Sequence, residues 1–487
     1  MKHKKNRTIG VWIAAIAVLL GILGMLPGST GAEELMTAVE FQVVMDAPDA
    51  QTDAEPDMTL GAYTNNRDNM MYLSVRDLAK LLNGTAAQFQ FELDEEQGTY
   101  CITSHRPYAA PEPETAPRPE SLEGLSEDEE GNLLDENGAV VWEANPKLPE
   151  RPEYEYLELY INPLTIDGRE VKYYSLQLAL TQDLYMNPTD LQLILGITMT
   201  KEDADTIRIS TDNGFVIDLA EYEADRHFDF FNGVVVGDAT TGEILYGYKE
   251  NNVDAVASTS KLMTWFITAR YLETGRIHWD DPVVLSDNVG ALIDFGYGIL
   301  PMNAGQEVML KDLMTAMMLA SSNEAALAIA EHVAGTEQEF VRLMNETADL
   351  LGLTTARFYN SNGLPVYSDS LIASVQENQM SAADLFRLSA AVLQTYPSIT
   401  DFTSQTEMDC PSLGYKVESS NYLLYNMPEC IGLKTGTTDE AGCCLVGASK
   451  VKKDDGEHIY VAVILSANSN IDRFQVPQLL LTWAAQQ

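Results

Sequence analysis

The chain is poor in basic residues, and this shortage excludes a whole class of partner. Its 487 residues contain 30 lysines and arginines against 73 aspartates and glutamates, so the formal net charge is -43. A surface of this charge repels nucleic-acid phosphates and anionic lipid headgroups, so we expect no nucleic-acid partner. The acidic balance itself is typical of solubility in a crowded or salty exterior.

Long apolar runs are also missing, apart from one near the N-terminus. A basic segment precedes an apolar stretch over residues 9–26, and small residues follow up to Ala32. This order is typical of a secretory signal peptide, so we expect residues 1–32 to direct export and to be cleaved after Ala32. The run is near the lower limit for crossing a bilayer, so an uncleaved anchor is the alternative. In both cases we expect an extracytoplasmic protein, in the cell wall, at the outer face of the membrane, or secreted.

Cysteine and histidine are too few and too scattered for a metal centre. The five cysteines include no C-x-x-C pair, and the six histidines include no H-E-x-x-H motif. We therefore expect neither a metal ion nor a cofactor. An odd number of cysteines leaves at least one thiol unpaired in an exported chain. A cross-strand disulfide from Cys430 to Cys443 or Cys444 and ordinary buried thiols are both open readings.

The chain is long enough for two or three domains, and its composition breaks once. Residues 107–154 are rich in proline and glutamate, so we expect an acidic linker that buries too little apolar surface to order itself. The flanking segments 33–106 and 155–222 look alike. Each places an aspartate, Asp77 or Asp190, at the start of an apolar-periodic helix and continues into alternating strands. We expect two small α+β modules that form a weak internal repeat.

The first of these segments resembles a known module. Tyr72, residues 76–78 and residues 82–85 are similar to the small stalk-type domain, also described as copper amine oxidase N-terminal-like, of exported bacterial proteins. The resemblance implies a spacer or a module that contacts the cell wall. It does not extend to copper binding.

Residues 226–487 have a different order of strand and helix patterns. Strand patterns occur near both ends of this region, at 233–248 and at 430–465, and several helical patterns lie between them. This order predicts one sheet built from both ends of the region and covered by helices.

Ser258 and Lys261 form an S-x-x-K sequence at the start of an apolar helix. Positions i and i+3 share a helix face, so the lysine amine can take the serine proton. A helix start also favours an oxyanion, because its backbone N–H groups are free to donate. The same spacing recurs at Ser449 and Lys452, in a lysine-rich strand end that we expect to be solvated and interpret as structural.

Four S-x-N sequences occur, and their surroundings distinguish them. Ser321 and Asn323 lie between two apolar helical runs, so a short loop can hold the hydroxyl and the amide rigidly. We interpret the other three as polar turns: Ser286-Asp287-Asn288, Ser419-Ser420-Asn421 and Ser466-Ala467-Asn468.

A third motif, Lys434-Thr435-Gly436, lies in an expected edge strand. Neighbouring strand residues point to opposite faces, so Lys434 and Thr435 can approach a carboxylate from two sides. The glycine allows a ligand to come close to the backbone.

In this order the three motifs resemble those of the serine-type D-Ala-D-Ala carboxypeptidases, the low-molecular-mass penicillin-binding proteins. Residues 358–365 and 432–438 are also close to that family's pattern. The resemblance implies a multidomain α/β (α+β) protein. Its catalytic domain would have the β-lactamase/transpeptidase-like fold, an antiparallel sheet with a helical cluster. The two small α+β modules would precede this domain in the chain.

The resemblance also implies roles for the first two motifs. Ser258 would attack the carbonyl between two terminal D-alanines and form an acyl-enzyme. Lys261 would be the general base, which requires a lowered pKa. Ser321 would carry a proton to the leaving D-alanine, and Asn323 would hold Lys261 and the substrate amide.

For the third motif, the resemblance implies substrate binding by Lys434, Thr435, Gly436 and Thr437. The first two would receive the terminal carboxylate, and the backbone N–H groups of Ser258 and Thr437 would form the oxyanion hole. Many members have histidine where this chain has Thr437, which alters the side chain at that position.

The implied partners are peptidoglycan stem peptides as substrate and β-lactam antibiotics as covalent inhibitors, with cell-wall contact through the N-terminal modules. A D,D-endopeptidase is one alternative. A β-lactamase is another, although the sequence offers no convincing deacylating glutamate. A wall-binding protein without activity would be expected to lack a catalytic residue, and none is missing.

Overall fold

The computed structural model describes residues 34–46, 59–66, 70–109, 126–127, 133–135, 139–142, 152, 154–178, 182–212, 214–224, 227–366 and 375–487. The chain divides into an N-terminal unit, Met1–Val216, and a C-terminal unit, Ile217–Gln487. The expected signal segment and much of the expected linker lie outside the described residues. No helix within the described ranges is long and apolar enough to cross a membrane.

The N-terminal unit interleaves two chain segments. The first contributes β1 (Glu34–Asp46), β2 (Thr59–Asn65), β3 (Met71–Ser74), α2 (Val75–Leu81), β4 (Phe89–Asp94) and β5 (Thr99–Ser104). The second contributes β9 (Tyr154–Leu157), β10 (Tyr160–Ile161), β11 (Leu164–Ile166), β12 (Arg169–Val171), β13 (Tyr174–Leu178), β14 (Asp183–Met186), α3 (Pro188–Leu195), β15 (Thr198–Lys201) and β16 (Thr206–Ser210). Three short strands lie within the expected linker: β6 (Ser126–Glu127), β7 (Leu133–Leu134) and β8 (Val140–Trp142).

Strands of the two segments pair directly. The larger sheet has the order β10-β13-β14-β3-β2-β1-β16-β15, with β9 paired to β1, and a smaller sheet has the order β12-β11-β5-β4. Strands β14 and β3 are antiparallel neighbours, while β16 lies parallel to β1 and β11 parallel to β5. Buried side chains from both segments also form one hydrophobic cluster. The two expected modules therefore share one core, because each leaves strand edges that the other covers.

The helices of this unit begin a few residues before the expected positions. Ser74 caps α2 by accepting a hydrogen bond from the backbone N–H of Asp77 at 3.0 Å, and Asn187 caps α3. The aspartates that marked the helix starts, Asp77 and Asp190, lie in the first turns instead. Serine and asparagine are strong capping residues, and carboxylates are favourable within the first turn.

The C-terminal unit contains the sheet that the sequence predicts. Its order is β18-β17-β27-β26-β25, with every neighbouring pair antiparallel. The strands are β17 (Gly233–Asp238), β18 (Glu243–Tyr248), β25 (Cys430–Thr438), β26 (Gly442–Lys453) and β27 (Gly456–Ala467). Strand β17 pairs with β27, so the sheet joins the two ends of the region, and β25 is its edge.

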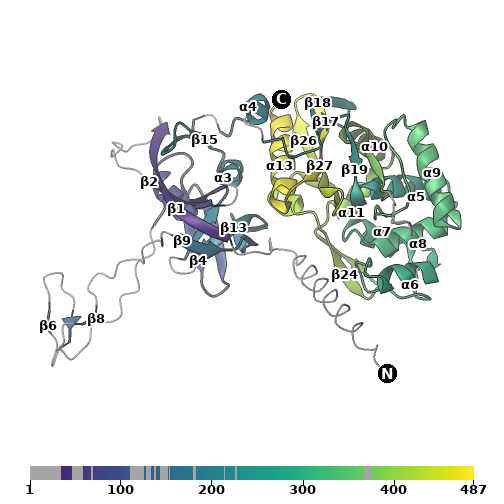
Figure 1. The fold of residues 1–487 in the computed structure, drawn as a ribbon, viewed down its shortest axis with the longest axis horizontal. Helices are drawn as coiled ribbons and strands as arrows, with labels where there is room; N and C mark the ends of the chain where they lie inside the picture. The colour runs from purple at the N-terminus through teal and green to yellow at the C-terminus, as the bar shows by residue number, and fades with distance from the viewer. Residues whose placement is uncertain are drawn as a thin grey trace, which may run out of the picture. The chain divides into compact units, whose positions relative to one another are not determined.

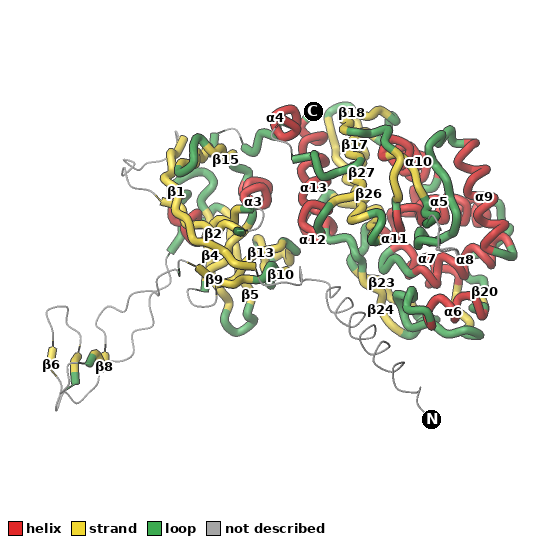
Figure 2. The backbone as a smooth tube through the Cα atoms, in the orientation of Figure 1, coloured by secondary structure: helices red, strands yellow, loops and turns green. Residues whose placement is uncertain are grey.

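Helices cover both faces of this sheet. Figure 1 shows α13 (Asn470–Gln486) on one face and α10 (Ala382–Thr395) on the other. Figure 2 shows the remaining large helices gathered beyond α10. They are α5 (Lys261–Glu273), α7 (Leu310–Met318), α8 (Asn323–Ala334) and α9 (Glu337–Leu350). Buried side chains such as Trp265, Met314 and Ile329 form one core between these helices and the sheet.

Shorter elements complete the C-terminal unit. They are α4 (Leu219–Ala224), β19 (Val253–Ala255), η1 (Ala257–Ser260), β20 (Pro282–Val284), α6 (Asp287–Asp294), β21 (Glu307–Met309), β22 (Gln379–Ser381), η2 (Pro397–Ile399), α11 (Thr400–Thr403), β23 (Glu407–Cys410), β24 (Tyr415–Glu418) and α12 (Leu423–Asn426). The unit thus starts at Ile217, before the expected residue 226.

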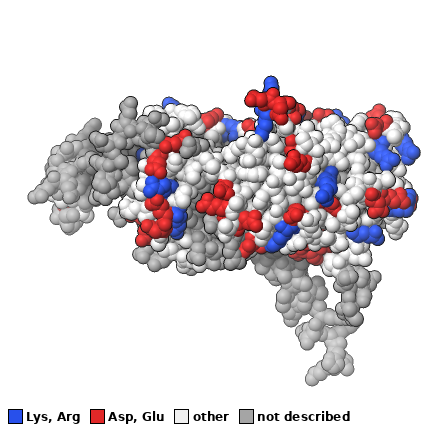
Figure 3. All heavy atoms as spheres, turned by 90° about the horizontal axis from the view of Figure 1, so that it is seen from above, with Lys and Arg blue, Asp and Glu red and all other residues white. Residues whose placement is uncertain are grey.

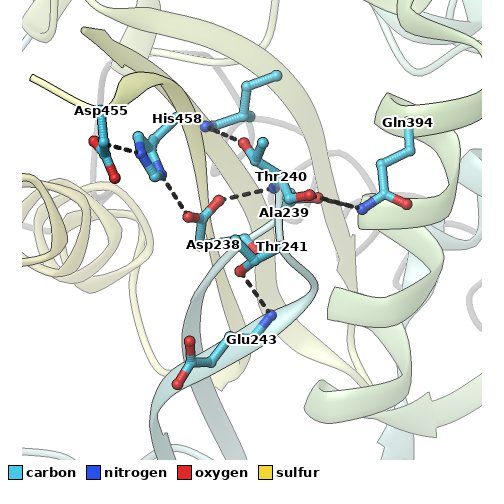
Figure 4. Close-up of polar contacts among 9 residues, drawn as sticks. Asp238, Ala239, Thr240, Thr241, Glu243, Gln394, Asp455 and His458 are labelled. Carbon is cyan, nitrogen blue, oxygen red and sulfur yellow. Dashed lines mark hydrogen bonds and ion pairs between the residues drawn. The ribbon is translucent and has the colours of Figure 1, made fainter. Parts of the chain in front are cut away.

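Charge is distributed without a single dominant patch on the face drawn in Figure 3. Acidic and basic side chains alternate there among many uncharged residues. One partly buried ion pair fixes the turn between β17 and β18 (Figure 4). Asp238 accepts a hydrogen bond from His458 at 2.7 Å, and the other ring nitrogen of His458 lies 3.1 Å from Asp455. These contacts join the turn to the start of β27.

Candidate active site

Ser258 and Lys261 lie at the junction of η1 and α5. The lysine Nζ is 2.7 Å from the serine Oγ, as the helical spacing predicts. Ser258 lies in the 3-10 turn rather than in the α-helix, whose first residue is Lys261. Ala257 opens this turn with a φ of 46°, in the left-handed region. Such a conformation is costly for a residue with a side chain and is typical of functional sites.

Lys261 is completely buried, and its amine has three oxygen neighbours. Besides Ser258, these are Oδ1 of Asn323 at 2.9 Å and the backbone carbonyl of Asn362 at 2.6 Å. Burial lowers the pKa of Lys261 well below its usual value, and the positive charge of Lys434 lowers it further. A neutral amine has two N–H groups and one lone pair. The two amide oxygens can accept both N–H groups, so the lone pair is left for the hydroxyl proton of Ser258.

The carbonyl of Asn362 belongs to a segment that packs closely against the 3-10 turn. Gly363 has a φ of 88°, and a Cβ at this position would lie 2.1 Å from the backbone oxygen of Ala257. Only glycine permits this approach. The Asn360 side chain accepts hydrogen bonds from the backbone N–H groups of Asn362 and Gly363, at 3.2 and 2.6 Å. The segment therefore presents its carbonyl to Lys261 in a fixed position.

The S-x-N motif lies in the loop between α7 and α8. Ser321 is half-buried with a φ of 64°, and Asn323 is the first residue of α8. The amide of Asn323 accepts from Lys261 and donates to the backbone oxygen of Tyr297 at 2.9 Å. Its nitrogen carries a second N–H group. The next residue, Glu324, is buried and accepts hydrogen bonds from the backbone N–H groups of Ile299 and Leu300.

The K-T-G motif lies on the edge strand β25, as the sequence predicts. A Cβ at Gly436 would lie 3.0 Å from the backbone nitrogens of both Ser258 and Thr259. The glycine therefore lets β25 come close to the turn that carries Ser258. Lys434 is 1% exposed, and burial together with the charge of Arg473 lowers its pKa to about 7. The buried amines of Lys261 and Lys434 thus lie close enough to repel each other.

Two further side chains meet this strand, and neither was expected from the sequence. Arg473, on α13, donates a hydrogen bond to the hydroxyl of Thr437 at 2.6 Å. The hydroxyl of Ser420 lies 2.7 Å from that of Thr435. Arg473 is far from K-T-G in sequence and has no motif of its own. Ser420 belongs to an S-x-N sequence that we interpreted as a polar turn.

The competing motif copies have other roles. Ser449 is buried within β26, where residues three apart point to opposite faces, so Lys452 cannot reach it. The expectation of a solvated position for Ser449 is therefore wrong. Ser286 is the N-cap of α6 and accepts from the N–H of Val289 at 3.3 Å, instead of lying in a polar turn. The hydroxyl of Ser466 donates to Asp254 at 2.6 Å.

All five cysteines are free thiols. In the hairpin of β25 and β26, Cys430 lies opposite Ser449, whereas Cys443 and Cys444 lie opposite Thr437 and Gly436. The register therefore keeps Cys430 away from both, and the disulfide interpretation is wrong. Among the described residues, no cluster of histidine, cysteine and carboxylate side chains has the arrangement of a metal site.

Comparison with known proteins finds relatives of the C-terminal unit. Residues 232–469 match the Peptidase S11 family model, described as D-alanyl-D-alanine carboxypeptidase. These residues are similar to that family. The chain is 31% identical over 244 residues to D-alanyl-D-alanine carboxypeptidase DacF of Bacillus subtilis, covering 49% of this chain and 58% of the relative. It is 28% identical over 226 residues to a D-alanyl-D-alanine endopeptidase of Pseudomonas aeruginosa, covering 45% and 67%.

Solved structures are also similar. The crystal structure of a peptidoglycan synthesis regulatory factor (PBP3) from Streptococcus pneumoniae has 30% sequence identity and a TM-score of 0.47, covering 52% of this chain and 76% of the other. The chain spans only 58% of the Bacillus subtilis relative. The family match ends near the start of α13 and does not include the N-terminal unit.

Proposed function

We propose that the C-terminal unit is a serine-type D-Ala-D-Ala carboxypeptidase, which removes the terminal D-alanine from peptidoglycan stem pentapeptides. One observation carries this proposal: the buried amine of Lys261 lies 2.7 Å from the hydroxyl of Ser258 and has a strongly lowered pKa. Burial favours the neutral form of such a lysine, so its amine can act as a base.

The reaction begins when Lys261 accepts the Ser258 proton and the serine oxygen attacks the carbonyl between the two D-alanines. The oxyanion is held by the backbone N–H groups of Ser258 and Thr437, at the close approach that Gly436 allows. The proton then passes through Ser321 to the amine of the leaving D-alanine as the C–N bond breaks. Water hydrolyses the resulting ester, which restores the Ser258 hydroxyl and releases the shortened peptide.

Recognition of the substrate end depends on charge. The carboxylate of the terminal D-alanine binds beside Thr435 and the buried ammonium of Lys434, and Arg473 adds positive charge near Thr437. Asn323 orients both Lys261 and the substrate amide. A β-lactam carries a carboxylate and an acylating carbonyl as well, so it acylates Ser258 and inhibits the enzyme. Because the substrate is peptidoglycan, the protein acts outside the cytoplasm.

The alternatives differ in the fate of the acyl-enzyme or in the bond cut. A β-lactamase needs a carboxylate free to activate water. Glu324, beside Asn323, instead accepts hydrogen bonds from two backbone N–H groups, which supports a carboxypeptidase. An endopeptidase would cut cross-links between stem peptides, and one relative carries that name.

Release of D-alanine from a synthetic stem pentapeptide tests the proposal. We expect release by the native protein and none by Ser258→Ala. Ser449→Ala is the matched control, because it removes the serine of the second S-x-x-K sequence. Release by Ser258→Ala would contradict the proposal, whereas products from cross-linked muropeptides alone would favour the endopeptidase.

For the N-terminal unit we propose a spacer that also contacts the cell wall, as its stalk-type resemblance implies. Cosedimentation of the whole protein with purified cell walls tests this, after penicillin has blocked the catalytic site. Cosedimentation that persists supports wall contact by another surface, and its loss would leave only the spacer role.

A further inference from the structure

Ser420 touches the candidate site although it belongs to none of the three catalytic motifs. It lies in the turn between β24 and α12, in the sequence Ser419-Ser420-Asn421. Its hydroxyl is 2.7 Å from the hydroxyl of Thr435, which is itself 5% exposed. The same hydroxyl lies 3.2 Å from the backbone oxygen of Leu319.

Leu319 ties this turn to the second catalytic motif. It is the C-cap of α7 and lies two residues before Ser321. Its backbone oxygen also accepts a hydrogen bond from the backbone N–H of Ser420 at 3.1 Å. Ser420 therefore bridges the loop that carries Ser321 and the strand that carries Thr435.

This bridge can adopt two hydrogen-bond arrangements. The hydroxyls of Ser420 and Thr435 and the carbonyl of Leu319 are three oxygens that share two protons. In one arrangement, the Thr435 hydroxyl donates to Ser420 and the Ser420 hydroxyl donates to the carbonyl of Leu319. In the other arrangement, the Ser420 hydroxyl donates to Thr435, so the Thr435 proton is free for a third acceptor. Leu319 keeps a partner in both cases, because the Ser420 backbone N–H still donates to it.

We propose that Ser420 is a positioning residue that orients the Thr435 hydroxyl toward the terminal carboxylate of the substrate. Without substrate, Thr435 donates to Ser420 and Ser420 donates to Leu319. When a carboxylate arrives, both hydroxyls turn: Ser420 donates to Thr435, and Thr435 donates to the carboxylate. No covalent bond changes. This inference rests on the proposed function of the site, and it adds a residue to carboxylate recognition.

The test compares two acylating agents that differ only in the group that Thr435 would bind. Benzylpenicillin has a free carboxylate, and its methyl ester does not. Loss of one hydroxyl-to-hydroxyl contact is expected to slow acylation of Ser420→Ala by benzylpenicillin about threefold to tenfold. Acylation by the methyl ester should be unchanged. Ser420→Thr keeps the hydroxyl and should restore the rate.

Ser419→Ala is the matched control. It removes a hydroxyl from the same turn, where Ser419 accepts from the N–H of Asn421 at 3.2 Å. We expect no change with either compound. An equal loss with both compounds for Ser420→Ala would overturn the proposal, because Ser420 would then only support the loop. No loss with benzylpenicillin would overturn it as well.

The failure of the proposed function has a different signature. A native protein that is acylated by benzylpenicillin but releases no D-alanine from a pentapeptide would contradict the carboxypeptidase proposal alone. The ratio of the two acylation rates would still be measured for each variant, so it would still decide the role of Ser420.

Discussion

At one place in each unit of the chain, buried charged side chains are arranged in opposite ways. In the N-terminal unit, Arg76 and Asp183 are both buried, and their charges lie 4.0 Å apart. Ser74 also donates a hydrogen bond to Asp183 at 2.6 Å. In the C-terminal unit, the buried amines of Lys261 and Lys434 lie near each other, and the charge of Arg473 lies near Lys434.

This difference distinguishes a charge pair that stabilises the fold from neighbouring cationic groups that lower the pKa of a buried amine. A cation beside an anion supports the contact between β14 and the start of α2, where the two halves of the N-terminal unit meet. A buried cation beside other cations has an unfavourable charge, and its pKa falls. The C-terminal unit therefore holds amines that lose their protons more readily than an ordinary lysine, which suits a base but costs stability.

The largest expected effect comes from placing a permanent charge at position 261, which removes the basicity of Lys261. Lys261→Arg stays protonated at every accessible pH, so it cannot accept the Ser258 proton. We expect the rate of acylation by benzylpenicillin to fall about a hundredfold to ten-thousandfold. Stopped-flow or gel-based acylation kinetics measure this. Rapid acylation by Lys261→Arg would show that position 261 needs only a positive charge.

A second test uses the charge of Lys434. With a pKa of about 7, its amine loses the proton as the pH rises through neutrality, so the carboxylate of a ligand loses its cationic partner. We expect the second-order acylation constant of the free enzyme to fall on the alkaline side. In Lys434→Arg the guanidinium stays charged, so this fall should move to higher pH. If the alkaline fall of the acylation constant is unchanged in Lys434→Arg, a group other than Lys434 causes that fall.

In the N-terminal unit, where opposite charges meet, we expect disruption of the contact to lower stability without lowering the acylation rate. Ser74→Ala removes the N-cap of α2 and the hydrogen bond to Asp183, at an expected cost of about 1–3 kcal/mol. Hydrogen exchange of peptides from α2 should become faster in this variant. Peptides from α5 and the acylation rate of Ser258 should not change. Slower acylation in Ser74→Ala would mean that the two units are energetically coupled.

The smallest effect is expected at His458, where opposite charges also meet within the C-terminal unit. Hydrogen bonds to Asp238 and then to Asp455 raise the pKa of His458. A raised pKa in the folded state stabilises the protein at acid pH, and this stabilisation is lost as the pH rises through that pKa. His458→Gln should therefore lower the melting temperature more at mildly acid than at alkaline pH. An equal loss at both would indicate that packing alone matters.

The sequence predicts the parts of the site that depend on local spacing. The contact between Lys261 and Ser258 follows from one helical turn, and the sheet built from β17 and β27 follows from the strand order. The backbone oxygen of Asn362 could not be predicted as a partner of Lys261, because a carbonyl leaves no signature in sequence. Arg473 was missed for another reason: it meets Thr437 only through the packing of α13 on the sheet.

The N-terminal unit shows the same limit on a larger scale. The strand patterns that became β3 and β14 were recognisable as parts of a repeat, but not as neighbours in one sheet. Alternating side chains define which face of a strand is buried, and they do not define which strand it pairs with. The helix caps Ser74 and Asn187 were overlooked because the aspartates in the first turns also fit a helix start.

The most direct test of the account is to locate the adduct after treatment with benzylpenicillin. Intact mass spectrometry should show one penicilloyl group per chain, and peptide mapping should place it on Ser258. The group should be absent from Ser258→Ala and present in Ser449→Ala. An adduct on any other residue, or one that persists in Ser258→Ala, would contradict the assignment of Ser258 as the nucleophile.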